Sequence, residues 1–99
     1  MQKKVKINDV FYELMEDYKD GFSINDVTGK ATEYFDGYDY IVGDWAYGKV
    51  RLKGFCDKGN PNYNKINDIS KKDSYIRKNC AYDCKYFVLK KIKVGDNNE

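Results

Sequence analysis

Apolar and polar residues alternate in residues 10–17 (VFYELMED), and this alternation predicts a strand. Tyr12 and Leu14 share one face of the extended segment, while Phe11 and Met15 share the other. Apolar side chains on both faces are typical of a strand that has neighbours on both sides. We therefore expect this segment to lie inside a sheet.

Two further strands are expected at Tyr38–Asp44 and Lys49–Cys56, joined by the four residues WAYG. This length and composition fit a hairpin in which Gly48 takes the left-handed conformation. A fourth strand is expected at Lys85–Val94, whose start contains the continuous apolar run YFVL. Such a run indicates burial on both faces of the strand.

Apolar residues recur at three- and four-residue spacings in residues 23–37, which predicts an amphipathic helix. Ser23 and Asp26 have the spacing of a capping box at its start. A second helix is expected to begin at Asp68 or Ser70 and to end near residue 81. Its inward-facing residues would be Ile69, Ile76 and Cys80.

The predicted order is strand, helix, strand, strand, helix, strand (βαββαβ), within a single α+β domain that spans residues 1–99. Two crossovers around a hairpin favour a mostly antiparallel sheet with two helices packed on it. A split βαβ arrangement and a related layered sandwich are both compatible with this order. The polar and basic residues 1–8 and the terminal GDNNE at 95–99 are expected to be flexible.

Composition supports a single folded domain, because 41% of the 99 residues are hydrophobic and 16% are aromatic. The longest apolar run, Tyr86–Leu89, is far too short to cross a bilayer, and the first residues lack the hydrophobic region of a signal peptide. We therefore expect a cytoplasmic protein without a membrane partner and with reduced thiols. The net charge of +2 gives little evidence about partners.

Two long sequence words carry a family resemblance: YDYIVGDWAYGKVRLKGF and, about thirty residues later, CAYDCKYFVLKK. Together they resemble the YutD-like family of small proteins from Gram-positive bacteria and their wall-less relatives, over a span from Glu16 to Lys91. Ala46 stands where relatives are expected to carry glycine, which makes the turn less permissive. The resemblance implies a cytoplasmic mixed α and β domain whose biochemical role is unassigned.

Histidine is absent, and this removes the commonest general base and every zinc site that depends on imidazole. Asp17, Asp39 and Asp44 lie near predicted strand ends and are the candidates for a metal-dependent phosphoesterase. The strand after them lacks the acid-spacer-lysine signature of many nucleases, and aspartates also serve turns and caps. The sequence therefore favours a noncatalytic protein without a cofactor.

Three cysteines, Cys56, Cys80 and Cys84, are weak candidates for a metal site or a thiol switch. A structural zinc site needs four ligands, and these thiols would require Asp57 or Asp83 as a fourth. Packing as small buried hydrophobic residues is the alternative that their type favours. We expect no bound metal.

The hairpin alternates aromatic and basic residues. If Ile41 and Trp45 face the core with Val50 and Leu52, the other face carries Tyr38, Tyr40, Val42, Arg51, Lys53 and Phe55. Rings that stack bases, beside cations that neutralise phosphates, are what binding of single-stranded RNA requires. We therefore predict a module that binds RNA or a ribonucleoprotein through Tyr38, Tyr40, Arg51, Lys53 and Phe55, assisted by Lys90, Lys91 and Lys93.

Two other interpretations of the hairpin remain open. A second layer of the fold could cover its rings, in which case their role would be packing. Alternatively, the same surface could dock a protein, which would make the chain an adaptor rather than an RNA-binding module.

Overall fold

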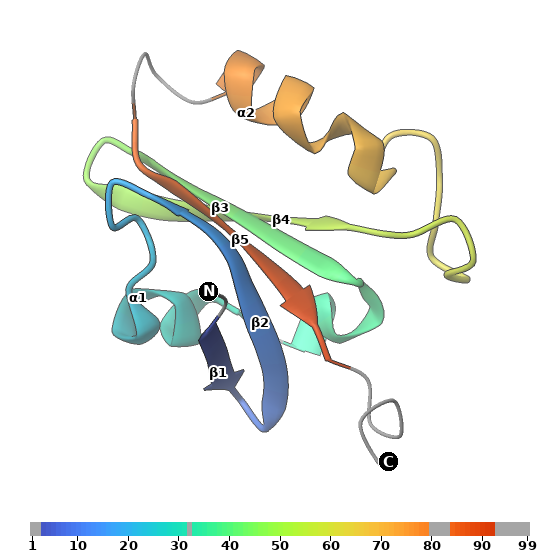
Figure 1. Cartoon of the computed structure of the whole chain (residues 1–99), viewed down its shortest axis with the longest axis horizontal. Coiled ribbons are helices and arrows are strands. Elements are labelled where there is room, and N and C mark those ends of the chain that lie inside the picture. Colours follow the sequence, from blue (N-terminus) through green and yellow to red (C-terminus); the bar gives the residue numbers. More distant parts are fainter. Residues whose placement is uncertain (1–2, 32, 80–83, 93–99) are drawn as a thin grey trace.

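The structure is a computed structural model that describes residues 3–31, 33–79 and 84–92. Five strands form one sheet in the order β1-β2-β5-β3-β4, and every neighbouring pair is antiparallel (Figure 1). None of the described helices is long and apolar enough to span a membrane. The elements are β1 (Lys3–Ile7), β2 (Val10–Tyr18), α1 (Ile24–Lys30), the 3-10 helix η1 (Glu33–Gly37), β3 (Tyr40–Ala46), β4 (Lys49–Phe55), the 3-10 helix η2 (Ile69–Lys71), α2 (Lys72–Asn79) and β5 (Tyr86–Lys91).

The sheet order makes β5 the central strand. It pairs with β2 on one side and β3 on the other, so β2 and β3 run parallel to each other with β5 between them. This is the split arrangement that the element order predicted. Phe87, Val88 and Leu89 are all buried, which confirms the expectation from the YFVL run.

The helices lie on opposite faces of the sheet, and the molecule therefore has three layers (Figure 1). On the face that we call the α1 face, Val27, Ala31 and Phe35 pack against strand residues that include Ile41 and Leu89. On the α2 face, a smaller cluster joins strand side chains to the helical side chains of η2 and α2; it contains Val42, Phe55, Val88, Tyr40, Ile69, Tyr75 and Ile76. The split strand order is therefore combined with a layered sandwich, in which a helix covers each face of the sheet.

The β3–β4 hairpin has a tighter turn than the sequence predicted. Ala46 pairs with Lys49, so only Tyr47 and Gly48 form the loop. Both have positive φ angles, 55° and 76°, as a two-residue turn that follows the strand twist requires. The expected left-handed glycine at position 48 is confirmed.

Strand β1 was not expected, because Lys3–Ile7 was assigned to a flexible basic segment. In the structure this segment pairs with β2, and Val5 and Ile7 pack on the α1 face. Lys4 and Lys6 alternate with them and project from the other face. The basic composition therefore concealed a short edge strand, whereas residues 95–99 lie outside the described part of the chain.

The helix ends also differ from expectation. Ser23 is the N-cap of α1, but its side chain makes no capping hydrogen bond, and α1 ends at Lys30 rather than continuing to Gly37. The Asp68 carboxylate accepts a hydrogen bond from the Ser70 amide and caps η2, which leads into α2.

Candidate binding surface

The pleat of the hairpin agrees with the sequence prediction for the strand residues. Tyr40 pairs with Phe55 and Val42 pairs with Lys53, so these four side chains share the α2 face. Tyr38 precedes the strand and lies on the α1 face, where its ring packs near Phe35 and against the backbone of Gly54. Tyr38 therefore does not share a face with Tyr40 and Phe55, contrary to the parity expected from the sequence.

Helix α2 covers the part of the platform around Phe55. The Phe55 side chain is only 1% exposed, and its ring meets the Tyr75 ring edge-on at a centroid distance of 5.7 Å. A ring enclosed in this way cannot stack on a nucleotide base. Lys53 remains half-buried, with its ammonium 5.7 Å from the centre of the Phe55 ring.

Arg51 is occupied by a carboxylate of the same protein. Its guanidinium donates two hydrogen bonds to the fully buried Asp44, at 3.2 Å from Nε and 2.6 Å from Nη2. The hydrogen bond to Asp44 is the main cause that raises the pKa of Arg51. A buried carboxylate needs such a cationic partner. Arg51 therefore links β4 to β3, and contact of its guanidinium with a ligand would compete with this ion pair.

Tyr40 lies at the border of the covered region. Its hydroxyl donates a hydrogen bond to Asp57 at 3.1 Å, and the Lys90 ammonium lies 6.0 Å from the centre of its ring. Burial, followed by the hydrogen bond to Asp57, raises the pKa of Tyr40 to about 12. Tyr40 and Lys90, both named for the RNA-binding surface, thus lie together on the α2 face.

Of the two other lysines predicted to assist, Lys91 does not join this surface. Lys91 pairs with Tyr12 and lies on the α1 side of β5, where its ammonium donates a hydrogen bond to the carbonyl of Asp36. Lys93 lies outside the described residues.

No described helix covers the β1–β2 end of the α2 face, since α2 and β1 are on opposite sides of the molecule in Figure 1. The register places Lys4, Glu13, Lys90 and Tyr40 in one row across four strands. The next row contains Lys6 and Phe11. We call the surface formed by Lys4, Lys6, Phe11, Glu13 and Lys90 the open sheet surface.

Phe11 is the centre of the open sheet surface. It is 46% exposed, an unusual position for a phenylalanine in the second strand of a sheet. The ammonium groups of Lys4 and Lys6 lie 5.9 and 5.7 Å from the centre of its ring. Sequence reasoning missed these residues because it assigned the lysines to a flexible segment; the alternation KVKI was the available signal.

The three aspartates proposed for metal chemistry are not brought together. Asp17 accepts a hydrogen bond from the Phe22 amide, and Asp39 accepts from the backbone amide of Asp57 and the side-chain amide of Asn60, whereas Asp44 binds Arg51. The register also puts Asp17 and Asp44 on opposite faces. Within the described residues, no group of three or more acidic or cysteine side chains could hold a metal ion.

The cysteines do not form a common site in the described structure. Cys56 is fully buried at the end of β4, and burial is the main cause that raises the pKa of its thiol. Cys84 is disulfide-bonded, which differs from the reduced thiols that we expected and removes its sulfur from metal binding. Cys80 lies outside the described residues.

Comparison with known proteins gives a consistent result. A family model described as "Putative antitoxin YutD-like" matches residues 6–90. The protein "Putative antitoxin YutD" of Bacillus subtilis (strain 168) is 42% identical over 89 residues, which cover 90% of this chain and 98% of that protein. The solution NMR structure of protein yutD from B. subtilis matches with a TM-score of 0.75 and 41% identity, covering 92% of this chain and 83% of that one.

Proposed function

Since the chain belongs to the YutD-like family, we propose that it is a noncatalytic antitoxin that binds a partner protein and blocks it. The description of its relatives as "putative antitoxin" supports a protein partner. The observation that carries the proposal is the exposed Phe11 ring, set among cations on a strand. An aromatic anchor with a polar rim is the usual composition of the centre of a protein interface.

Site-specific photocrosslinking tests this proposal. Benzoylphenylalanine in place of Phe11 is expected to form an adduct with one discrete protein in nuclease-treated lysate of the organism's own cells. The matched control carries the same crosslinker in place of Tyr47, a fully exposed aromatic residue at the hairpin tip. Absence of an adduct specific to position 11 would count against this surface.

The captured protein then permits a quantitative test with purified components. In calorimetric titration, Phe11→Ala is expected to weaken binding by about tenfold or more, because it removes the central aromatic side chain. Tyr47→Ala should bind as the wild type does. In cells, expression of the partner should arrest growth, and the wild type but not Phe11→Ala should relieve that arrest; equal relief by both would contradict the proposal.

Binding of single-stranded RNA is the second candidate, favoured by the ammonium groups placed over the Phe11 and Tyr40 rings. The open sheet surface would then replace the platform predicted on the hairpin. One base would stack on Phe11, and phosphates would contact Lys4, Lys6 and Lys90. Glu13 lies in the same row and reduces the positive charge that RNA would meet.

Fluorescence anisotropy with a labelled oligouridine at low salt tests the RNA candidate. The variant Lys4→Glu with Lys6→Glu should weaken binding and reduce the slope of log K against log salt by about 0.7 for every phosphate that is no longer neutralised. A matched pair with the same charge change, Lys30→Glu with Lys58→Glu, should retain more of the binding. No binding at low salt, or equal weakening in both pairs, would exclude RNA at this surface.

A further inference from the structure

Positive charge is concentrated in one segment of the chain. Residues 49–79, which run from β4 to the end of α2, carry nine lysine and arginine side chains against three aspartates, whereas the rest of the chain carries nine against thirteen acidic residues. Two of the nine are held by carboxylates, since Arg51 binds Asp44 and Lys72 binds Glu16. A protein with a net charge of only +2 thus contains a strongly basic segment.

Three lysines of this segment line one hollow between β4 and the helices η2 and α2. The hollow has a volume of about 180 Å³, and it is lined by Lys53, Phe55, Ile66, Lys71, Ser74, Tyr75 and Lys78. None of these described residues is acidic. Lys53 also borders a hollow on the α1 face, but its side chain belongs to the α2 face, because it pairs with Val42 and its ammonium lies 5.7 Å from the centre of the Phe55 ring. We call the space between β4 and α2 the lysine hollow.

Helix geometry brings Lys71 and Lys78 to the same side. Residues 71, 74, 75 and 78 are separated by three or four positions where they are neighbours, so they share one side of the continuous segment η2–α2. Seven residues of helix rise by about 10 Å, and Ser74 lies midway between the two lysines. The flexible lysine stems can therefore carry both ammonium groups toward Ser74, while Lys53 approaches from β4.

The charge of the lysine hollow is not neutralised by the described part of the chain. Within residues 3–31, 33–79 and 84–92, none of the three ammonium groups forms an ion pair with a carboxylate. Lys71 and Lys78 are exposed, so a ligand can reach them from solvent. Like charges around one hollow repel one another, and an anion between them would relieve this repulsion.

The size and composition of the lysine hollow indicate which anion it would take. Pockets that enclose drug-sized ligands measure about 300–1,000 Å³, so a hollow of about 180 Å³ fits one ionic group rather than a whole ligand. A phosphate monoester carries close to two negative charges at neutral pH, which matches three lysines better than a carboxylate does. Lysine binds phosphate as a point charge, and the Ser74 hydroxyl can donate a hydrogen bond to a phosphate oxygen. Ile66, which is 75% exposed, offers an apolar contact to an organic group that carries the phosphate.

We propose that the lysine hollow binds a phosphate group, either free or carried as a monoester by a small molecule. The three lysines neutralise the charge of the phosphate, and the Ser74 hydroxyl donates a hydrogen bond to it. This inference goes beyond the proposed function, because the lysine hollow lies at the β4 end of the sheet, whereas Phe11 lies on β2 toward the other end. The crosslinking test at position 11 is therefore independent of it.

NMR titration of the isotope-labelled protein at fixed ionic strength tests the inference, with adenosine monophosphate, inorganic phosphate and adenosine as probes. Both phosphate compounds should shift the amide resonance of Ser74 and the side-chain resonances of Lys71 and Lys78. Weaker binding of inorganic phosphate would support an organic carrier, whereas equal binding would identify free phosphate as the ligand. Adenosine should leave these resonances unchanged, because it lacks the phosphate.

Substitutions that remove charge but keep a polar side chain locate the site. Lys71→Gln with Lys78→Gln should weaken binding of adenosine monophosphate by about tenfold or more, because two of the three cations are lost. The matched control, Lys3→Gln with Lys30→Gln, makes the same charge change at exposed lysines of β1 and α1 and should bind as the wild type does. Circular dichroism should show that both variants are folded. Equal weakening in the two pairs, equal shifts with adenosine, or no shift at Ser74 with either phosphate compound would overturn the inference.

Discussion

At Gly43, the absence of a side chain makes room for the Phe87 ring. A Cβ at this position would overlap Cζ of Phe87, which is fully buried in the α1-face core. Gly54 accommodates the Tyr38 ring in the same way, since a Cβ there would lie 2.5 Å from Cγ of Tyr38. Two glycines in neighbouring strands thus leave room for large rings close to the backbone, which helps an aromatic-rich core fit between a sheet and one short helix.

Gly43→Ala is therefore expected to destabilise the protein by about 1–3 kcal/mol, because the added methyl group overpacks a filled core. Gly29→Ala is the matched control, since a Cβ there meets nothing within 4 Å. That change should stabilise α1 by about 0.5–1 kcal/mol. Urea unfolding followed by circular dichroism measures both, and equal stability of the two variants would contradict the packing argument.

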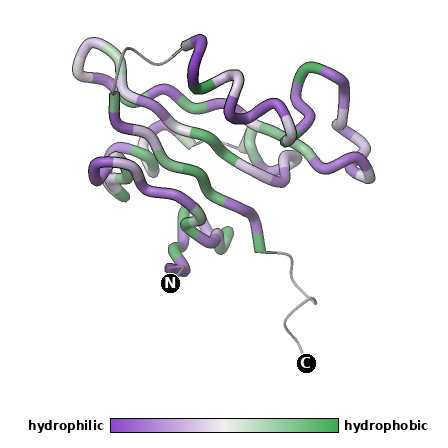
Figure 2. The backbone as a smooth tube through the Cα atoms, turned by 45° about the horizontal axis from the view of Figure 1, so that its top comes forward, coloured by the Kyte–Doolittle hydropathy of each residue, from purple (hydrophilic) through white to green (hydrophobic). Residues whose placement is uncertain are grey.

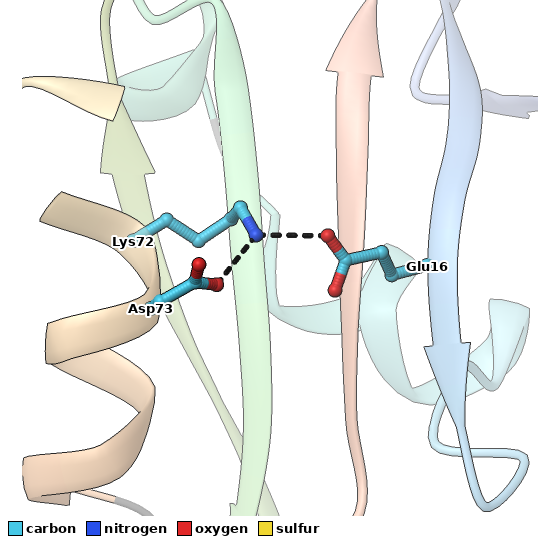
Figure 3. A network of polar contacts seen from close by, with 3 residues as sticks. All are labelled: Glu16, Lys72 and Asp73. Carbon is cyan, nitrogen blue, oxygen red and sulfur yellow. Dashed lines mark hydrogen bonds and ion pairs between the residues drawn. The ribbon is translucent and has the colours of Figure 1, made fainter. Parts of the chain in front are cut away.

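Helix α2 is attached to the sheet by few contacts for its length. Its residues are mostly hydrophilic, as Figure 2 shows, and its apolar contact rests on Tyr75 and Ile76. The Lys72 ammonium donates to Glu16 of β2 and to Asp73, both at 2.8 Å, and thereby ties the start of α2 to a strand far away in the sequence (Figure 3). The helix that covers the hairpin platform thus depends on one ion pair and a small apolar cluster.

Lys72→Met should loosen α2 by about 0.5–1 kcal/mol, because it removes the ion pair with Glu16 but keeps an apolar stem. Hydrogen exchange should accelerate at α2 amides and stay unchanged in β3. In a double-mutant cycle, Glu16→Gln should add little in the Lys72→Met background. Additive effects of the two substitutions would show that the ion pair does not hold the helix.

The Asp68 carboxylate, which caps η2, predicts how the stability of this element depends on pH. The Tyr63 hydroxyl donates to Asp68 at 2.7 Å; this bond, followed by the Ser70 amide, lowers the pKa of Asp68 from 3.8 to about 2. A depressed carboxyl pKa stabilises the fold above the unfolded-state pKa, and this contribution is lost as the pH falls from about 4 to about 2. In an NMR titration, Tyr63→Phe should raise the pKa of Asp68 toward 3.8, whereas Tyr47→Phe should leave it unchanged.

For the whole molecule, the three-layer arrangement gives one sheet two different faces. Among the residues whose burial is described, the α1 face carries the larger core, with ten buried residues, whereas the α2-face cluster has three. The smaller cover on the α2 face leaves the open sheet surface exposed at its β1–β2 end. Both candidate functions use this surface, which lies at the end of the sheet away from β4.

Burial of Tyr12 in the larger core predicts alkaline sensitivity of the fold. Burial, followed by the charge of Asp36, raises the pKa of Tyr12 from 10.0 to about 12. A raised pKa means that the stabilising contribution is complete below pH 10 and is lost as the pH rises toward 12. Urea midpoints should fall over this range, and they should fall less in Tyr12→Phe than in the wild type. The exposed control Tyr47→Phe should behave as the wild type does.

Sequence patterns correctly predicted which strand residues of the hairpin share a face, because successive side chains of a strand alternate between the two faces. Val42 and Phe55 are on the α2 face, whereas Ile41 and Val50 are on the α1 face, as expected. The same reasoning placed Tyr38 on the wrong face, since that residue precedes the strand and is not bound by its alternation. Parity also could not show that Phe55 would be covered.

The candidate surface was predicted only in part. Of the residues named for RNA binding, Lys90 lies in the open sheet surface and Tyr40 is its neighbour in the same row, but Phe11 was assigned to a strand interior and the lysines before it to a flexible end. Strand β1 is an edge strand with lysine at alternate positions, and its pairing with β2 stabilises it. The composition of residues 3–7 does not show that this pairing occurs.

The sequence by itself determined the order of the four main strands and two helices, the turn at Gly48 and the faces of the hairpin, because hydrophobic periodicity and glycine conformation act over a few residues. Only the tertiary structure decided that α2 lies on the face opposite α1, that Lys3–Ile7 joins the sheet, and that Phe11 stays exposed. These outcomes depend on contacts such as Lys72 with Glu16, 56 residues apart in the chain. Such contacts form only when the whole sheet has assembled.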